Sequence, residues 1–222
     1  MAQGRMTYNV RYGTSSPVVI HHDDDAGHDG HVAIGLLCRV PDGYGSAPHP
    51  TTRTFDVVGE GRASIARVST EQTGSRLSGR PAVYRVDDQY GAPLGRITYR
   101  SGRALRGARA RWTVETVTGR RVSGFRGRLF WWALWWPVGL PVSLVCLILS
   151  LLGEGDGAFG KPRRVIWRDS SRRAHLVFRG IEDEYRVLDG SWDPRLVAAL
   201  LGLHQSYDPS EGSGAHGWYV RP

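Results

Sequence analysis

The chain has 222 residues and a formal net charge of +8, a length that suits one domain with an insertion or tails and can bury a hydrophobic core. Its two cysteines exclude a disulfide framework and a cysteine-rich metal site, and they favour a reducing compartment. Residues 51–128 hold sixteen arginines against six acids, whereas residues 153–222 are balanced. The single lysine beside twenty-eight arginines is typical of a GC-rich bacterial genome, so the ratio is not evidence of phosphate recognition.

Residues 1–52 are predicted to form a mobile polar extension, because they are rich in Gly, Pro, His and Asp, with one apolar interruption over residues 31–40. The N-terminus shows no apolar core behind a basic start, so no cleaved secretory signal is predicted. Residues 21–31 hold four histidines and four aspartates, which are suitable zinc or nickel ligands. Their spacing matches no established site. We interpret the cluster as a solvated loop that binds metal only adventitiously, and we predict no metal site and no cofactor.

From residue 52 onward the chain alternates short β-type runs with turn residues. No stretch between these runs is long enough for a crossover helix, so the runs are predicted to form antiparallel hairpins in series. The predicted strands cover residues 55–58, 63–68, 82–86, 94–99, 111–117, 121–125, 165–168, 175–178 and 184–188.

A helix is predicted over residues 193–204, where Asp193 is a favourable N-cap and Pro194 a favourable first helical residue. Beyond Arg195 this helix is apolar around its whole circumference, which indicates burial, and it is too short to span a bilayer. The strands are therefore expected to wrap around it. His204 is interpreted as a cation at the C-terminus of the helix. Residues 205–222 are predicted to form a polar tail, although residues 218–220 could dock.

Residues 129–152 interrupt the strand pattern with twenty-four residues that carry no charge. At about 1.5 Å per residue a helix of this length reaches roughly 36 Å, enough for one crossing of a hydrocarbon core about 30 Å thick. Pro137 and Pro141 disfavour a straight helix. The alternative is a helix buried inside a soluble domain. Membrane-inserting residues are predicted at Trp131, Trp132, Trp135, Trp136, Leu147 and Ile148.

The residues that flank this stretch carry six basic side chains before it and five after it within twenty residues, so the positive-inside rule gives no orientation. If the strands on both sides belong to one sheet, they must share one side of the membrane. We therefore expect a segment that enters the bilayer and returns, or lies in its interface, rather than a single crossing.

Basic residues gather immediately before the apolar stretch, where each is attracted to anionic lipid by about 1 kcal/mol. The alternative is a solvated basic face of a sheet. The predicted headgroup-binding residues are Arg103, Arg106, Arg109, Arg111, Arg120, Arg121, Arg126 and Arg128.

Residues 84–97, YRVDDQYGAPLGRI, resemble the strand, Asp/Gly turn and Leu-Gly-x-Ile return of the family that groups the tubby C-terminal domain, phospholipid scramblases and LURP-one-related proteins. Residues 185–194, YRVLDGSWDP, are similar to that family's final strand and the start of its central helix. The resemblance covers residues 53–204 without the insertion. It implies an antiparallel β-barrel of about twelve strands around an apolar C-terminal helix, interrupted here by a hydrophobic helical insertion. The acidic calcium-binding segment of scramblases is not matched, since only Asp189 and Asp193 stand there.

The sequence predicts a non-enzymatic module on the cytoplasmic face of a membrane that binds anionic phospholipid or acts as a scaffold. Two alternatives remain open: lipid translocation of the scramblase type, and a soluble β-barrel associated with nucleic acid or another partner. The apolar stretch offers few polar residues for a translocation groove. The arginines are not interleaved with exposed aromatic residues, so no specific nucleic acid is expected. No phosphate-binding loop or nucleophile elbow is present, so an enzyme is not expected.

Overall fold

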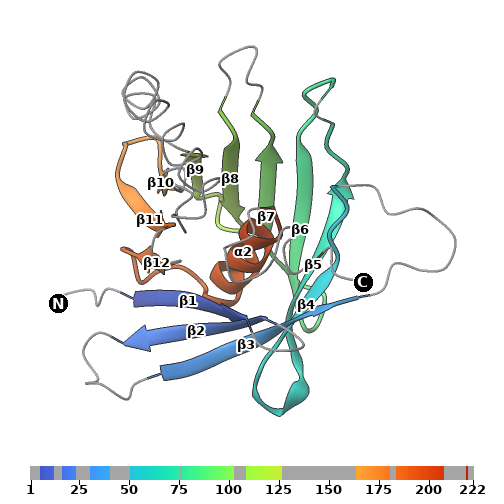
Figure 1. The fold of residues 1–222 in the computed structure, drawn as a ribbon, viewed down its shortest axis with the longest axis vertical. Coiled ribbons are helices and arrows are strands. Elements are labelled where there is room, and N and C mark those ends of the chain that lie inside the picture. Colours follow the sequence, from blue (N-terminus) through green and yellow to red (C-terminus); the bar gives the residue numbers. More distant parts are fainter. Residues whose placement is uncertain are drawn as a thin grey trace, which may run out of the picture.

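The computed structural model describes residues 6–12, 17–23, 31–40, 51–75, 77–102, 109–126, 164–180, 184–207 and 219. Twelve strands of this part of the chain form one closed antiparallel barrel around helix α2 (Figure 1), which confirms the predicted fold class. The elements are β1 (Met6–Tyr12), β2 (Pro17–Asp23), β3 (His31–Arg39), β4 (Phe55–Val58), η2 (Glu60–Arg62), β5 (Ser64–Gln72), β6 (Ala82–Asp88), β7 (Pro93–Arg100), β8 (Arg111–Thr116), β9 (Arg121–Arg126), β10 (Arg164–Arg168), β11 (Ala174–Arg179), β12 (Glu184–Val187) and α2 (Pro194–Tyr207).

Each strand pairs with its neighbours in the sequence, and β1 pairs with β12 to close the ring, with Tyr8 opposite Tyr185. In an antiparallel ring the connections alternate between the two ends of the barrel. We call the end where β9 stops and β10 begins the insertion end, and the opposite end the turn end. The β5–β6 hairpin also reaches the insertion end, at the top of Figure 1, whereas α2 begins at the turn end.

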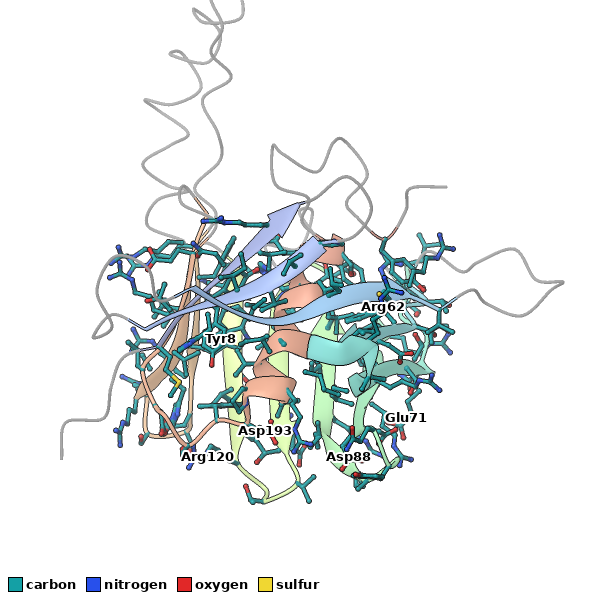
Figure 2. All side chains as sticks on the ribbon, turned by 90° about the horizontal axis from the view of Figure 1, so that it is seen from below. Tyr8, Arg62, Glu71, Asp88, Arg120 and Asp193 are labelled. Atoms are coloured by element: carbon teal, nitrogen blue, oxygen red, sulfur yellow. The ribbon has the colours of Figure 1, made fainter. Side chains whose placement is uncertain are left out.

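Helix α2 fills the barrel because the strands alternate between apolar and polar side chains and turn the apolar ones inward. In β6, for example, Ala82, Tyr84 and Val86 are buried and Arg85 is exposed. Every helix residue from Leu196 to Ser206 is buried, as the apolar circumference predicted. Figure 2 shows the helix enclosed between the strands of the two halves of the ring.

The predicted helix start is also confirmed. The Arg195 amide donates to Asp193 Oδ1 at 2.9 Å, and the Val197 amide donates to the Asp193 carbonyl at 3.0 Å. Further along α2, a Cβ on Gly202 would lie 2.9 Å from the Leu37 side chain and 3.0 Å from the Phe55 ring. Only a residue without a side chain therefore lets the helix approach β3 and β4 this closely.

His204, interpreted as a cation at the C-terminus of the helix, lies in the last turn of α2, but its side chain is buried. His204 is 2 % exposed, and its Nδ1 lies 2.8 Å from the Tyr185 hydroxyl inside the barrel. Its ring packs against Trp112, Trp167 and Phe178 at centroid distances of 4.8 to 5.7 Å. The helix continues to Tyr207, so His204 lies in its last turn, with its side chain in the core.

The prediction that residues 1–52 form a mobile extension before the barrel is also wrong, because this region supplies β1, β2 and β3. Tyr8, Val10, Val19 and Leu37 point into the core and are at most 6 % exposed. In β1 the alternate positions are polar, and the segments between the three strands are rich in Gly, Pro, His and Asp, so the average composition of residues 1–52 is polar although each strand has an apolar face. The barrel therefore begins at Met6 rather than near residue 53.

The His/Asp cluster at residues 21–31 is likewise not one solvated loop. His21 belongs to β2, and its ring lies 5.0 Å from the Tyr8 ring, while His22 of β2 pairs with His31 of β3. Residues 24–30 lie outside the described part of the chain. Within the part that is described, no group of three or more metal-ligating side chains is found.

The apolar stretch 129–152 lies outside the described residues, and with it the predicted membrane-inserting residues Trp131, Trp132, Trp135, Trp136, Leu147 and Ile148. Its two attachment points are described. Val165 of β10 pairs with Arg126 of β9, so the chain leaves the barrel and returns to it at neighbouring positions of one end. The strands on both sides thus belong to one sheet. No helix within the described ranges has the length and apolar character needed to cross a bilayer.

Candidate anion-binding groove

A groove of about 340 Å³ runs along the outer wall of the barrel over β9 and β10 and reaches the β10–β11 turn. Its apolar floor comes from Phe125 and Ile166. Four guanidinium groups line it, from Arg109, Arg164, Arg168 and Arg172.

The two strands place these side chains by simple alternation. In β9 and β10 the residues Val122, Val165 and Trp167 turn into the core and are at most 1 % exposed, so the residues between them face outward. Cross-strand pairing then sets Ile166 beside Phe125, and Arg168 beside Ser123. The outer side of the wall is therefore basic at both ends of β10 and apolar in the middle.

Phe125 contacts one of these four guanidinium groups, that of Arg109, and a fifth at the edge of the groove, that of Arg111. Its side chain is 41 % exposed, and the Cζ atoms of Arg109 and Arg111 lie 5.1 Å and 5.3 Å from its ring centroid. Arg111 also donates to Ser123 Oγ at 3.0 Å. Such cation–π contacts are worth about 0.5–1 kcal/mol each at exposed sites and hold the arginines in place.

The β10–β11 turn shapes the part of the groove that lies at the turn end of the barrel. Arg168 Nη1 donates to the Arg172 carbonyl at 2.8 Å, and the Arg172 amide donates to the Asp169 carbonyl at 3.1 Å. Arg172 has φ of 67°, in the left-handed region where a side chain costs about 1–2 kcal/mol relative to glycine. An arginine therefore occupies a position at which the backbone favours glycine.

Six arginines on the described part of the barrel, all outside the groove, each form an ion pair with a neighbouring acid. Among the described residues, Arg164, Arg168 and Arg172 form no ion pair. Within the described ranges these three guanidinium groups are therefore not neutralised by an ion pair. Pairs with N–O distances of 2.5 to 2.8 Å join Arg67 to Asp56, Arg85 to Asp87, Arg96 to Glu71, Arg186 to Glu184, and Arg195 to Asp193.

One carboxylate, Asp169, also lines the groove, and it is bonded within its own hairpin. Its Oδ2 lies 3.0 Å from His175 Nε2, and its Oδ1 accepts from Ser171 Oγ at 2.6 Å. His175 is 5 % exposed, and its Nδ1 lies 3.2 Å from Asp189 Oδ2. The hydrogen bonds from His175 and Ser171 hold the pKa of Asp169 well below the usual carboxyl range, and those from Ser191 lower the pKa of Asp189.

These lowered pKa values predict a loss of stability in acid. A carboxyl whose folded-state pKa lies below its unfolded value of about 3.9 stabilises the fold above that pH, and the contribution is lost as the pH falls toward the folded-state pKa. The urea midpoint of the protein is therefore expected to fall between pH 6 and pH 3. The fall should be smaller in Asp169→Asn, which has no charge to lose at this position. An equal fall in both proteins would contradict this assignment.

The predicted headgroup-binding arginines are divided by the structure. Arg109 and Arg111 lie at the groove, whereas Arg120 donates to Asp189 Oδ2 at 3.0 Å at the turn end, and Arg121 lies opposite Glu115 near the same end. Arg126 ends β9 next to the insertion. Arg103, Arg106 and Arg128 lie outside the described residues.

Sequence reasoning missed the other half of the groove. Arg164, Arg168 and Arg172 follow the apolar stretch, and the sequence analysis used them only to weigh orientation. The alternation of Arg164, Ile166 and Arg168 at every second position was the available signal, because it places all three on one face of a strand.

No family model, curated protein or solved structure matches this chain. The likeness to the tubby, scramblase and LURP-one-related family therefore stays a prediction.

Proposed function

We propose that this protein is a non-enzymatic module that binds anionic phospholipid surfaces, with phosphate groups in the arginine groove and residues 129–152 in the apolar part of the bilayer. The observation that carries the proposal is positional. Arg164 is the first described residue after the insertion, and it lines the groove. In the strand register it lies opposite Arg179 of β11, and its neighbour Val165 lies opposite Arg126 of β9. The unneutralised arginines thus begin where the apolar stretch leaves the barrel.

The chemistry of the groove fits a phosphate-bearing surface. Guanidinium groups donate paired, charge-assisted hydrogen bonds to phosphate oxygens, and they are held here by an aromatic ring and a backbone carbonyl. An apolar segment with basic residues at its root matches the layering of a bilayer, in which the phosphates lie outside the hydrocarbon. Since Arg126 and Arg164, the described residues on either side of the insertion, lie at one end of a closed barrel, the segment would enter the bilayer and return on the same side.

Arg172→Gly is the variant of choice for testing the proposal, because glycine suits the left-handed backbone and the protein is expected to fold. Losing one arginine near the surface lowers the affinity for anionic vesicles by about 1 kcal/mol, or about fivefold. The variant that combines Arg164→Gln, Arg168→Gln and Arg172→Gly should lose on the order of a hundredfold. The measurement is cosedimentation with phosphatidylcholine vesicles that contain about a third phosphatidylglycerol.

Arg62→Gly is a matched control. Arg62 is also an arginine with a left-handed backbone, at φ of 63°, but it lies in η2, on the other side of the barrel from Arg120 in Figure 2. This variant carries the same charge change and is expected to bind like the wild type. Equal losses in both variants would show that only net charge matters, and the groove would not be the site.

The apolar contribution can be separated because β9 and β10 are neighbours. A Pro-Asp-Gly linker in place of residues 127–163 forms, together with Arg164, a four-residue loop between the paired Arg126 and Val165, and it should leave the barrel folded. This variant is expected to keep salt-sensitive vesicle binding and to become extractable by carbonate. If it stays resistant to carbonate, the apolar stretch is not the anchor.

Phe125 supports a second candidate, binding of single-stranded nucleic acid. The sequence analysis disfavoured this function because no exposed aromatic residue lay among the arginines, yet Phe125 is exposed between Arg109 and Arg111. Both guanidinium groups already contact the ring, so we rank this candidate below lipid. Fluorescence anisotropy with a labelled oligonucleotide decides between them, with Phe125→Ala as the variant. Lipid translocation, which the resemblance implies, can be measured in the same vesicles.

A further inference from the structure

We propose that His175 is a positioning residue of the arginine groove: it holds the Asp169 carboxylate away from the arginines and so keeps the groove open to an anion. This inference rests on the proposed function. It adds that anion binding at the surface depends on a histidine that is buried and does not line the groove.

The first step of the argument concerns Asp169, which stands beside Arg168 in the sequence and lines the same groove as Arg172. A carboxylate in this place is expected to pair with a neighbouring guanidinium, as Asp56 and Asp193 do elsewhere on the barrel. It forms no such pair. Its Oδ2 is bonded to His175 Nε2 at 3.0 Å, and its Oδ1 accepts from Ser171 Oγ at 2.6 Å and from the Arg173 amide at 2.9 Å.

The second step concerns what fixes His175. Its Nδ1 lies 3.2 Å from Asp189 Oδ2, a charge contact without hydrogen-bond geometry, and its ring packs 6.2 Å from the Trp192 ring at an angle of 72°. Asp189 is held in turn by Arg120 Nη1 at 3.0 Å and by Ser191 Oγ at 2.6 Å. The β8–β9 turn and the segment between β12 and α2 therefore keep the imidazole in place. The charged groups that face it are Asp169 and Asp189, with Arg120 behind Asp189.

The third step is the consequence of losing the imidazole. Asp169 Oδ2 would then lack its side-chain partner, and the guanidinium groups of Arg168 and Arg172 belong to the same turn. An ion pair with either of them would cancel one positive charge and place a carboxylate in the path of the ligand. His175 thus acts on the groove through Asp169, without contacting the ligand.

The test is a double-variant cycle that separates positioning from mere stability. His175→Leu is expected to lower the affinity for anionic vesicles about tenfold, an ion-pair effect of ordinary size near a protein surface. His175→Leu combined with Asp169→Asn should bind at least as tightly as the wild type, because the released side chain no longer carries a charge. A structural role alone would give no such rescue. Circular dichroism checks that each variant is folded.

Asp87→Asn in the His175→Leu background is the matched control, since it removes one negative charge from another part of the barrel, where Asp87 pairs with Arg85. It is expected to give no rescue. The inference is overturned if His175→Leu binds like the wild type, if Asp169→Asn fails to restore binding, or if Asp87→Asn restores it equally.

Calorimetry with inorganic pyrophosphate separates failure of this inference from failure of the proposed function. If the wild type binds pyrophosphate but not vesicles, the membrane function fails, and the cycle is scored on pyrophosphate. If it binds vesicles but not pyrophosphate, the cycle is scored on vesicles. If it binds neither, the groove is not an anion site and both proposals fall.

Discussion

A chain that starts at residue 53 should fail to form the barrel. This shortened chain still contains all the strands and the helix that were predicted from the sequence, but it lacks β1, β2 and β3. Their loss leaves β4 and β12 as unpaired edges and uncovers α2 at Gly202, where Leu37 packs. We expect no cooperative thermal unfolding and a strong tendency to aggregate, measured by circular dichroism and size-exclusion chromatography.

The control for this truncation is a chain that lacks only residues 2–5, which lie before β1. It should unfold like the full chain. A chain of residues 53–222 that unfolds cooperatively at the wild-type temperature would show that the first three strands do not belong to the folding unit.

Leu201→Ala in α2 is expected to destabilise the barrel by about 2–5 kcal/mol, because the removed atoms leave a cavity that the surrounding strands cannot fill. Leu201 has no exposed surface and lies in the single core cluster. For a protein of this size each kcal/mol lowers the midpoint of thermal unfolding by about 2–4 °C. Scanning calorimetry should therefore show a fall of roughly 4–20 °C in that midpoint.

Leu36→Ala provides the matched comparison, since Leu36 faces outward on β3 and is 38 % exposed. The same chemical change at that position should alter the free energy of unfolding by no more than about 0.5 kcal/mol. Similar effects of the two substitutions would mean that α2 does not organise the core.

The part of the fold from β4 onward could be predicted because local signals agree there. Phe55–Val58 was predicted residue for residue, and the start of α2 follows from the cap at Asp193. The N-terminal strands gave no such agreement. The polar segments between them lower the mean hydropathy of residues 1–52. A strand such as β2 is also stabilised by pairing with its neighbours, which composition does not reveal.

The groove could be predicted only in part for a related reason. Arg109 and Arg111 were identified because they precede the apolar stretch in the sequence. Arg164 and Arg168 lie on the other side of that stretch, and only the pairing of β9 with β10 brings them together with Phe125. The role proposed for His175 has no sequence signal at all, because it depends on the distance to Asp169 across a turn.

The seam between β1 and β12 sets the order of events during synthesis. Strand β1 cannot pair with β12 until Tyr185, which lies opposite Tyr8 in the closed ring, has been synthesised. At about 5–20 residues per second this delay lasts roughly 10–35 seconds. The arginine-rich strands and the whole apolar stretch are made within that interval, before the ring can close. Any chaperone or membrane that receives the nascent chain therefore meets an open sheet with two free edges, and the final strand and helix convert that sheet into the barrel.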